Sequence, residues 1–443
     1  MPSYVPLFVN MLRSMILRNC VSNFYFTVLG VAGFPRSGGS GKPQVWSAGE
    51  ASPVLILNNT WRNGEYRIII NYRGSMAVKY SVIVALDNRY ELTTNFIETL
   101  VSTTDFSDGE LIIIVDGCKD KDTLDYLEQI KAQLNYVYLI IIDEQSGYSI
   151  ANNTAVAQSD GDILVFINSD VLLCNGSIEE LVNFINNDPS IGAAQGRLIY
   201  PQNNRIQSTG HLFIGQHNSH VYKGKPSNHP LVLEKGIRQA LTTAFCAIRR
   251  SVFNSFGGFS ENYFNAYEGM ELTLKITYSG LKCIYYPDAV AYHITGATRS
   301  NMKFSNELAG KIFWAKWSDK IRRDISDYIK PQITDKIRNQ VYFIIDCGSL
   351  PDWDFTLEEI SITSSGKIKI RDRHDKSIDL YCNLPFATLH YSGAYLFLCD
   401  DILALRGNYN WCSVRNNSLD LVIDSHGNVE SLHSVVGISD SDA

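Results

Sequence analysis

The chain has 443 residues, of which 45% are hydrophobic and 19% charged, a composition that excludes fibrous and disordered proteins. Its net charge of -7 offers no basic footprint for a nucleic acid polymer, and no apolar run reaches the about 20 residues that span a bilayer. Nine scattered cysteines without a Cys-x-x-Cys pair argue against a disulfide framework or zinc site. We therefore expect a cytoplasmic globular protein of two or three domains that binds no nucleic acid polymer.

Residues 1–76 form an irregular N-terminal segment with a Gly/Ser-rich break. One hairpin is predicted there, from VLILN (54–58) and EYRIIINY (65–72) around Asn63-Gly64. The run Gly74-Ser75-Met76 resembles a fusion junction or an internal start. The segment is therefore interpreted as either a small β module or a vector-derived leader.

Strands and helices alternate in residues 77–325. Apolar runs at 80–86, 110–116, 137–143 and 162–168 predict strands covered on both faces. Helices are predicted at 91–101, 122–134 and 150–158 between these strands, and at 177–187 after them. This succession predicts an α/β domain with a doubly wound, mostly parallel sheet.

The pattern changes to short alternating strands in residues 338–443. Hairpins are predicted at 360–370, from ISIT and KIKI, and at 419–432, from LDLVID and NVESL. We expect a C-terminal all-β accessory domain, most economically a sandwich. Its role in glycan binding, oligomerisation or capping of the α/β domain stays open.

Polar side chains gather where the predicted strands end. The residues at these ends are Ala85 and Asp87, then Asp116, then Asn168, Ser169 and Asp170. An isolated Asn-Ser-Asp run is typical of a solvated turn, but ligands bind at the carboxyl ends of parallel strands. Carboxylate and amide oxygens there can hold a hard divalent cation against a diphosphate. We therefore expect a nucleotide site at this edge, with Asp116 accepting from a pyrimidine N–H.

Gly147 opens the third predicted helix. A glycine at a helix N-terminus lets backbone approach a phosphate. Neither Gly-x-Gly-x-x-Gly nor a Gly-Lys-Ser/Thr loop occurs in the sheet region, which disfavours dehydrogenases and kinases. A nucleotidyltransferase would need a basic, glycine-rich loop after the first strand, where only Arg89 is present.

Two carboxylates, Glu268 and Glu271, begin a predicted helix that Gly280 closes. They can supply a general base for an acceptor hydroxyl or simply interact with the helix dipole, and the pattern leaves both open. His293 follows a strand-like run and is either a metal ligand or a structural histidine. Four further histidines fall in one short segment rich in Gly, Ser, Asn and Lys, which predicts a mobile loop rather than a second metal site. These are His211, His217, His220 and His229.

In their order and spacing, these features resemble family 2 glycosyltransferases with the GT-A fold, especially the bacterial O-antigen and rhamnosyltransferase-like branch. The resemblance runs from Tyr80 to about Trp317. Its landmarks read YSVIVALDN, IIIVDG, SGYSIANNTAVAQSDGDILVFINSD, GAAQGRLIYPQNNRIQSTG, FCAIRRSVFNSFGGFSENYF, YEGMEL and YHITGATRS.

The resemblance implies an inverting glycosyltransferase that moves a sugar from a nucleotide-diphosphate donor to a glycan or lipid-linked acceptor in surface polysaccharide synthesis. It implies Mn²⁺ or Mg²⁺ held by Asp170 and Asn168, with His293 as a further ligand, and an enzyme base that deprotonates the acceptor. The donor-binding residues it implies are Ala85, Asp87, Asp116, Gly147, Asn153, Asn168, Ser169 and Asp170. Arg299, in the run Thr298-Arg299-Ser300, is either a further donor-binding residue that contacts phosphate from a lid or a solvated surface arginine. Peripheral association with the inner face of the membrane and homo-oligomerisation stay open.

Two positions depart from the family pattern. Asn168 replaces the first Asp of the usual Asp-x-Asp motif. Gly269 stands where the family usually has the Asp that acts as the catalytic base. Either Glu268 or Glu271 has taken over as catalytic base, or the chain is a catalytically lapsed sugar-nucleotide or glycan-binding protein. The sequence does not choose between them.

Overall fold

The computed structural model describes residues 79–86, 89–294, 303–333, 342–346, 372–373, 394–405 and 420–436, together with five short N-terminal strands. The chain divides into two compact units, Met1–Ala77 and Val78–Ala443. Asp87, Arg299 and the hairpin predicted at 360–370 lie outside the described residues.

The first unit contains two small antiparallel sheets. One has the strand order β1-β5-β4, with β1 (Tyr25–Val28), β4 (Thr60–Arg62) and β5 (Glu65–Ile69), and the other pairs β2 (Val45–Trp46) with β3 (Leu55–Ile56). β4 and β5 pair with Arg62 opposite Glu65, so a hairpin is present where the sequence predicts one. Its first strand is β4 rather than the VLILN run, because β3 pairs with β2 instead.

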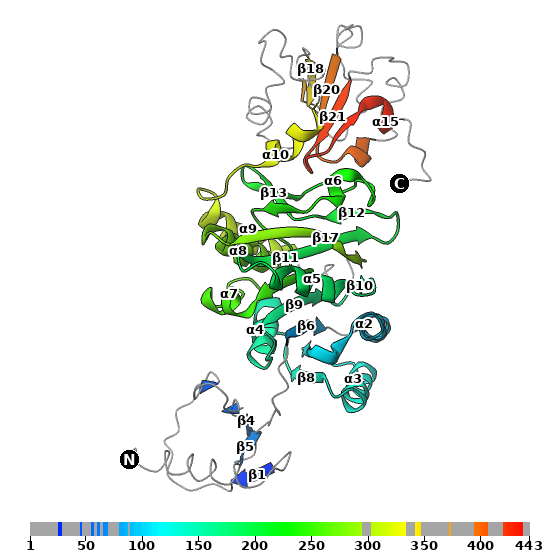
Figure 1. Ribbon diagram of the computed structural model, residues 1–443. Helices are drawn as coiled ribbons and strands as arrows, with labels where there is room; N and C mark the ends of the chain where they lie inside the picture. The colour runs from blue at the N-terminus through cyan, green and yellow to red at the C-terminus, as the bar shows by residue number, and fades with distance from the viewer. Residues whose placement is uncertain are drawn as a thin grey trace. The chain divides into compact units, whose positions relative to one another are not determined.

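Four parallel strands form one side of the ten-stranded sheet of the second unit, as predicted (Figure 1). They are β6 (Tyr80–Leu86), β7 (Gly109–Asp116), β8 (Val137–Ile142) and β9 (Ile163–Asn168), in the order β9-β6-β7-β8. The predicted helices are α2 (Tyr90–Thr103), α3 (Lys121–Gln133), α4 (Tyr148–Ala157) and α5 (Ser177–Asn186). Because β6 to β9 are parallel, their carboxyl ends meet at one edge of the sheet.

The sheet continues beyond β9 with strands of mixed direction, in the order β10-β17-β11-β16-β9. These strands are β10 (Val171–Leu173), β11 (Ile191–Tyr200), β16 (Phe245–Arg249) and β17 (Lys282–His293), with β12 (Arg205–Ser208) beside β11 and β15 (Gly236–Arg238) beside β17. β11 and β12 form an antiparallel hairpin. β17 is one continuous strand that runs through to His293.

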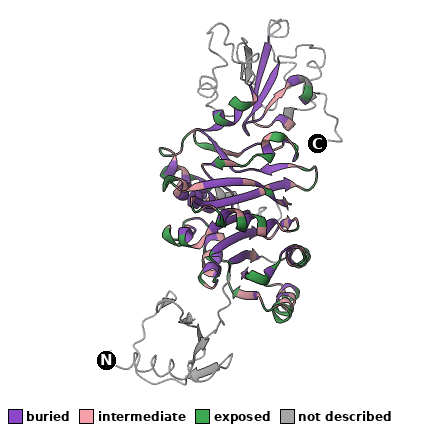
Figure 2. Ribbon diagram, viewed as in Figure 1, coloured by how far each residue is buried: buried purple, intermediate pink, exposed green. Residues whose placement is uncertain are grey.

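Helices cover both faces of the sheet, as the uniformly apolar strands predict. Along β6, Val82 and Val84 pack with α2, α3 and α5. Ile83 faces the other way, toward α4, α7 (Arg250–Ser255) and α8 (Glu268–Tyr278). Figure 2 shows the central strands buried, with exposed residues on the outer sides of the helices. Burial on both faces stabilises each strand by about 25 cal/mol per Å² of apolar surface, so the strand ends are held in fixed positions.

The histidine-rich segment is an antiparallel hairpin, and the prediction of a mobile loop there was wrong. β13 (His211–Ile214) pairs with β14 (His217–His220). Its apolar run Leu212, Phe213 and Ile214 is fully buried, and this burial orders the segment. Burial also lowers the pKa of His211 to about 4, so its ring is neutral at physiological pH. Short helices α6 (Pro230–Leu233) and α10 (Ile325–Ile329) and the longer α9 (Lys303–Trp317) complete this region.

The described C-terminal strands form one mixed sheet, not the antiparallel sandwich that their alternation suggests. The elements are β18 (Tyr342–Asp346), β19 (Asp372–Arg373), β20 (Ala394–Cys399), η3 (Ile402–Leu405), β21 (Leu421–Asp424), β22 (Val429–Ser431) and α15 (Leu432–Val436). The predicted β21–β22 hairpin is present, but β18 to β21 pair in parallel. β20 is buried along its whole length, and Leu396 and Leu398 share a core with Leu212. Burial on both faces is the usual condition of parallel strands.

Candidate functional site

The structure places Asn168, Ser169 and Asp170 at the carboxyl end of β9, as predicted. β6 and β9 are in register with Ala85 beside Asn168. The Asn168 backbone N–H donates to the Ala244 carbonyl at 3.0 Å, which fixes the last residue of the strand. The chain then turns through Ser169 and Asp170 into β10.

Asp170 and His293 meet, although they are far apart in sequence. β10 pairs with β17 so that Val171 lies opposite His293, and the Ile294 N–H donates to the Asp170 carbonyl at 2.9 Å. The Asp170 Oδ1 and His293 Nε2 atoms are 2.9 Å apart, and both residues are buried. A strand pairing therefore delivers the carboxylate and the imidazole to one point at the edge of the sheet.

Gln207 fixes the proton on the His293 ring. Its amide oxygen lies 2.7 Å from Nδ1, and because this oxygen can only accept, Nδ1 carries the hydrogen. The ring then faces the Asp170 carboxylate through Nε2. This atom either donates a second N–H to Oδ1, as in an imidazolium, or offers a lone pair that a shared cation would bridge to the carboxylate. Nothing within the landmark run that contains Gln207 marks it as a partner of His293, because β12 brings the two together only in the fold.

The residues at this point fit a divalent cation. A carboxylate suits Mg²⁺ or Mn²⁺, and an imidazole favours a transition metal ion such as Mn²⁺. Asn168, two residues before Asp170, carries an amide oxygen of the same ligand class. A polar partner on the second ring nitrogen, here Gln207, is the usual support of a metal-binding histidine. Within the described ranges, no group of three or more His, Cys, Asp or Glu side chains could hold a metal, so donor oxygens would have to complete the coordination.

Asp116 anchors the loop that enters α4. Its Oδ1 accepts from the N–H and hydroxyl of Ser146 at 2.7 and 2.8 Å, and its Oδ2 accepts from the Gly147 N–H at 2.9 Å. Gly147 has φ +91, and a Cβ there would lie 2.6 Å from the Phe264 carbonyl oxygen. Asp116 thus holds the glycine turn at the edge of the sheet. Its contact with a nucleotide base stays a prediction.

Asn153 holds the loop before α8. Its Nδ2 donates to the Phe259 carbonyl at 2.9 Å, and its Oδ1 accepts from the Phe259 N–H at 3.0 Å. The amide is therefore engaged on both sides by backbone. In this structure Asn153 positions a loop, and a direct role in donor binding is still to be tested. Asp87 and Arg299 fall outside the described residues.

Glu271 is a buried carboxylate surrounded by donors. Its Oε1 lies 2.7 Å from the Lys316 Nζ and 3.0 Å from the Lys275 Nζ, and its Oε2 accepts from the Tyr263 hydroxyl. Burial would raise the pKa of Glu271. The hydrogen bonds from Lys316, Tyr263 and Lys275 outweigh burial, so the pKa of Glu271 lies below its ordinary value. A carboxylate held in this way is a poor base.

Glu268, at the start of α8, faces a different neighbourhood. It is buried beside Tyr148 of α4, whose pKa is raised by burial and further by the charge of Glu268. The Tyr148 hydroxyl lies 3.3 Å from the Thr243 Oγ1, and Thr243 immediately precedes the residue that bonds Asn168. Glu268 therefore lies on the side of α8 that adjoins the end of β9. The sequence did not single out Tyr148 or Thr243.

Thr243 also occupies the space that a side chain at position 269 would need. A Cβ at Gly269 would lie 2.5 Å from the Thr243 Oγ1 and 2.6 Å from its Cγ2. An aspartate there requires Thr243 to move. The packing of α8 against the segment before β16 therefore leaves no room for a carboxylate side chain at position 269.

Comparison with known proteins identifies the α/β region. Residues 78–310 match the family described as glycosyltransferase like family 2. The uncharacterized protein y4gI of Sinorhizobium fredii is 28% identical over 262 residues, covering 58% of this chain and 28% of y4gI. The O-antigen biosynthesis protein RfbC of Myxococcus xanthus is 27% identical over 244 residues, covering 53% of this chain and 18% of RfbC.

A third relative is closer in length. The O-antigen chain rhamnosyltransferase RfbN of Salmonella typhimurium is 26% identical over 278 residues, which are 60% of this chain and 84% of RfbN. This chain thus spans less than a third of y4gI and RfbC but most of RfbN.

Proposed function

The chain belongs to glycosyltransferase family 2, and we propose that it is an inverting, metal-dependent enzyme that moves a sugar from a nucleotide-diphosphate donor to a glycan or lipid-linked acceptor. The observation that carries this proposal is the pairing of Asp170 Oδ1 with His293 Nε2 at the carboxyl edge of the sheet. The carboxylate and the imidazole, which Gln207 orients, would hold a cation at the edge of the sheet where a donor diphosphate would lie.

The residues divide the reaction between them. The acceptor hydroxyl oxygen attacks the anomeric carbon of the donor sugar, and its proton passes to the Glu268 carboxylate. The bond from the anomeric carbon to the diphosphate oxygen breaks, and its electron pair leaves with the nucleoside diphosphate. A cation bound by Asp170, His293 and Asn168 would neutralise the charge that develops on the leaving diphosphate.

Glu268 is the favoured base because Glu271 is not available. The Glu271 carboxylate is engaged by two lysines and a tyrosine, and its pKa is lowered. Glu268 adjoins Tyr148 and the Thr243 segment next to β9. The two glutamates are three residues apart on one helix but have opposite tasks, Glu268 in chemistry and Glu271 in packing.

The biological setting follows from the relatives and is also part of the proposal. RfbC and RfbN are named for O-antigen biosynthesis, and RfbN is a rhamnosyltransferase. We assign this chain to surface polysaccharide synthesis in the cytoplasm, at the inner face of the membrane where the acceptor is lipid-linked. Of the helices that the structure describes, none has the length and apolarity needed to cross a bilayer.

A donor screen tests the proposal. Thermal unfolding is followed with a panel of nucleotide sugars and Mn²⁺, because a ligand that binds only the native state at about 100 times its Kd stabilises it by about 2.7 kcal/mol. Donor cleavage is then measured as nucleoside diphosphate release. We expect one donor to raise the Tm and to be cleaved, and Asp170→Ala to abolish both effects.

Asp162→Ala is the matched control, since Asp162 is an exposed aspartate at the opposite end of β9. It should behave as the wild type. Equal donor cleavage by Asp170→Ala would refute the metal role. Binding without cleavage across the whole panel would instead favour the catalytically lapsed interpretation, which the closed packing at Gly269 motivates.

A further inference from the structure

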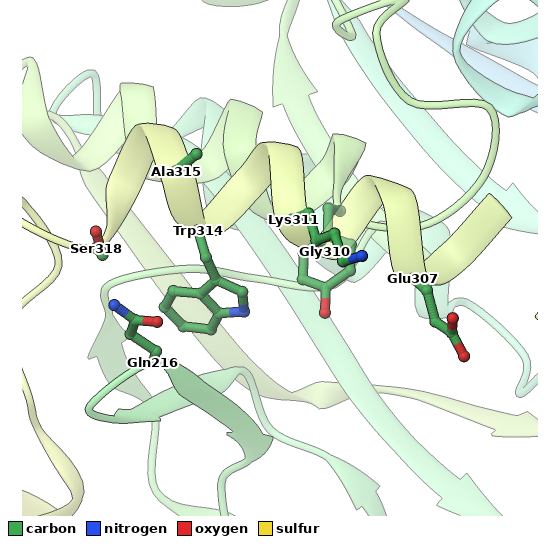
Figure 3. Close-up of a pocket in the computed structure, with 8 residues that line it drawn as sticks. Gln216, Glu307, Gly310, Lys311, Trp314, Ala315 and Ser318 are labelled. Atoms are coloured by element: carbon green, nitrogen blue, oxygen red, sulfur yellow. The ribbon is translucent and has the colours of Figure 1, made fainter. Parts of the chain in front are cut away.

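A cavity of about 850 Å³ lies between α9 and the β13–β14 turn. Figure 3 shows the Trp314 indole extending from α9 beside the Gln216 side chain of the turn. The volume of the cavity falls in the range of about 300–1,000 Å³ that small-molecule sites occupy. The residues that line it are Gln216, Tyr267, Glu307, Gly310, Lys311, Trp314, Ala315 and Ser318.

Two aromatic side chains of this cavity are held in place by their surroundings. Trp314 meets Phe313 edge to face at 5.1 Å between ring centroids, and it meets Phe213 in the same way at 6.3 Å. Tyr267 lies 4.9 Å from the Phe313 ring, and the Trp314 side chain is near enough to its hydroxyl to oppose the rise in pKa that burial causes. The aromatic wall is therefore preformed.

The backbone at Ala266 and Tyr267 has a strained conformation. Ala266 and Tyr267 have φ of +80 and +69, a conformation that residues other than glycine rarely adopt. Such strain concentrates at ligand sites, where the surrounding structure maintains it. Gly310 on α9 leaves room for the ring, because a Cβ there would lie 3.2 Å from the Tyr267 hydroxyl.

The wall and its rim have the chemistry of a carbohydrate site. A pyranose ring has one face of C–H groups, which pack on an indole, and a perimeter of hydroxyls that donate and accept hydrogen bonds. Glu307 and Lys311 lie one helical turn apart beside Trp314, and Gln216 and Ser318 add an amide and a hydroxyl. Aromatic surface with a few polar groups at its edge is the usual composition of a small-ligand pocket.

Tyr267, which lines the cavity, directly precedes the proposed base Glu268 in the chain. A base has to lie within hydrogen-bond reach of the hydroxyl that it deprotonates. A sugar held against Tyr267 and Trp314 would belong to an acceptor whose reactive end extends toward α8.

We propose that Trp314 and Tyr267 form a sugar-binding platform that holds a pyranose ring of the acceptor glycan. The assignment to the acceptor rests on the proposed function, whereas binding of a pyranose does not. Trp314 is a positioning residue in this scheme and takes no part in proton transfer.

Saturation-transfer NMR on the full chain, without donor or metal, tests the platform. The probes are methyl α-L-rhamnopyranoside, methyl α-D-mannopyranoside and methyl β-D-galactopyranoside. We expect saturation to reach the ring C–H protons of at least one glycoside. Trp314→Ala should weaken its binding about tenfold, as expected for the loss of one aromatic contact.

Two further variants keep the test decisive. Ala315→Phe fills the cavity from an exposed position and should also reduce binding, whereas Leu308→Ala, at an exposed site on α9 outside the lining, should not. Thermal melts confirm that each variant is folded. No saturation of any glycoside, or equal saturation in the wild type and Ala315→Phe, would overturn the platform. If glycoside binding persists while donor cleavage fails in every protein, the platform stands and the proposed function falls.

Discussion

The carboxyl ends of the strands and the start of α8 differ in what brings their candidate residues into position. At the strand ends, Asn168 and Asp170 occupy the positions that parallel strands give them, and pairing of β10 with β17 adds His293. At α8, Glu268 and Glu271 have the same side-chain chemistry and lie on one helix turn, yet only Glu271 is held by Lys316 and Lys275, whereas Glu268 lies beside Tyr148. Sheet topology fixes what meets at the first site, whereas side-chain packing decides which residue can act at the second.

The difference shows why a carboxylate in a sequence motif is only a candidate base. Burial, hydrogen bonding and nearby charges together set its pKa. Lys316 comes from α9, forty-five positions after Glu271. No local sequence pattern predicts that it will pair with this carboxylate. The comparison between the two glutamates can therefore be tested by substitutions on each side.

The largest expected effect is a loss of kcat that distinguishes Glu268 from Glu271. Glu268→Gln removes the proposed base and should lower kcat by about 10²–10⁴-fold, the usual contribution of a general base. Glu271→Gln should leave kcat within about tenfold of the wild type but lower the free energy of unfolding by about 1–3 kcal/mol, because its charged hydrogen bonds are weakened. Donor-cleavage kinetics and urea unfolding measure the two quantities. The opposite pattern would make Glu271 the base.

The second prediction concerns Asp324, which supports the hairpin that carries Gln216. Burial raises the pKa of Asp324 to about 6, although hydrogen bonds from Gln239 and the Phe213 N–H oppose the rise. Because the folded state favours the protonated form, its contribution to stability is full below about pH 4 and is lost as the pH rises through 6. The expected loss is about 2–3 kcal/mol.

Urea unfolding between pH 4 and 7 measures this change. Asp324→Asn should flatten the profile across that window. Asp327→Asn, which replaces a neighbouring exposed aspartate paired with Arg322, should not. A profile that is unchanged in Asp324→Asn would show that this group does not titrate with folding.

The smallest effect concerns the closed packing at position 269. Gly269→Ala normally favours a helix by about 1 kcal/mol, but here the methyl group would collide with Thr243. We expect a net destabilisation of about 1–2 kcal/mol, which Thr243→Ala in the same chain should partly relieve. A double-mutant cycle by chemical unfolding gives the coupling. Additive effects would mean that Thr243 does not fill this space.

Much of the fold could be predicted from sequence because its signals are local. The strands β6 to β9 are nearly all apolar, and helices fill the intervals between them, so periodicity alone places both. The same signals failed where burial by distant residues decides the structure. The His211 hairpin looked polar and mobile, but Leu212 and Phe213 lie in cores built partly from residues beyond 310.

The candidate site divides in the same way. Asp170 was identifiable because it directly follows a buried strand, and His293 because it ends another. Gln207, Tyr148 and Thr243 had no distinguishing pattern, since each becomes relevant only through a partner on another element. The tasks of Asp116 and Asn153 as loop anchors likewise depend on backbone groups that a motif does not reveal.

The most direct test of the proposed site is pulsed electron paramagnetic resonance of Mn²⁺ bound to the protein with a nucleoside diphosphate. If Asp170 and His293 hold the cation, the spectrum should show electron spin echo modulation from one coordinated imidazole nitrogen. His293→Gln should remove this modulation, and Asp170→Ala should release most of the bound Mn²⁺. A wild-type spectrum without nitrogen modulation, or one that His293→Gln leaves unchanged, would contradict the assignment of the donor site to this edge of the sheet.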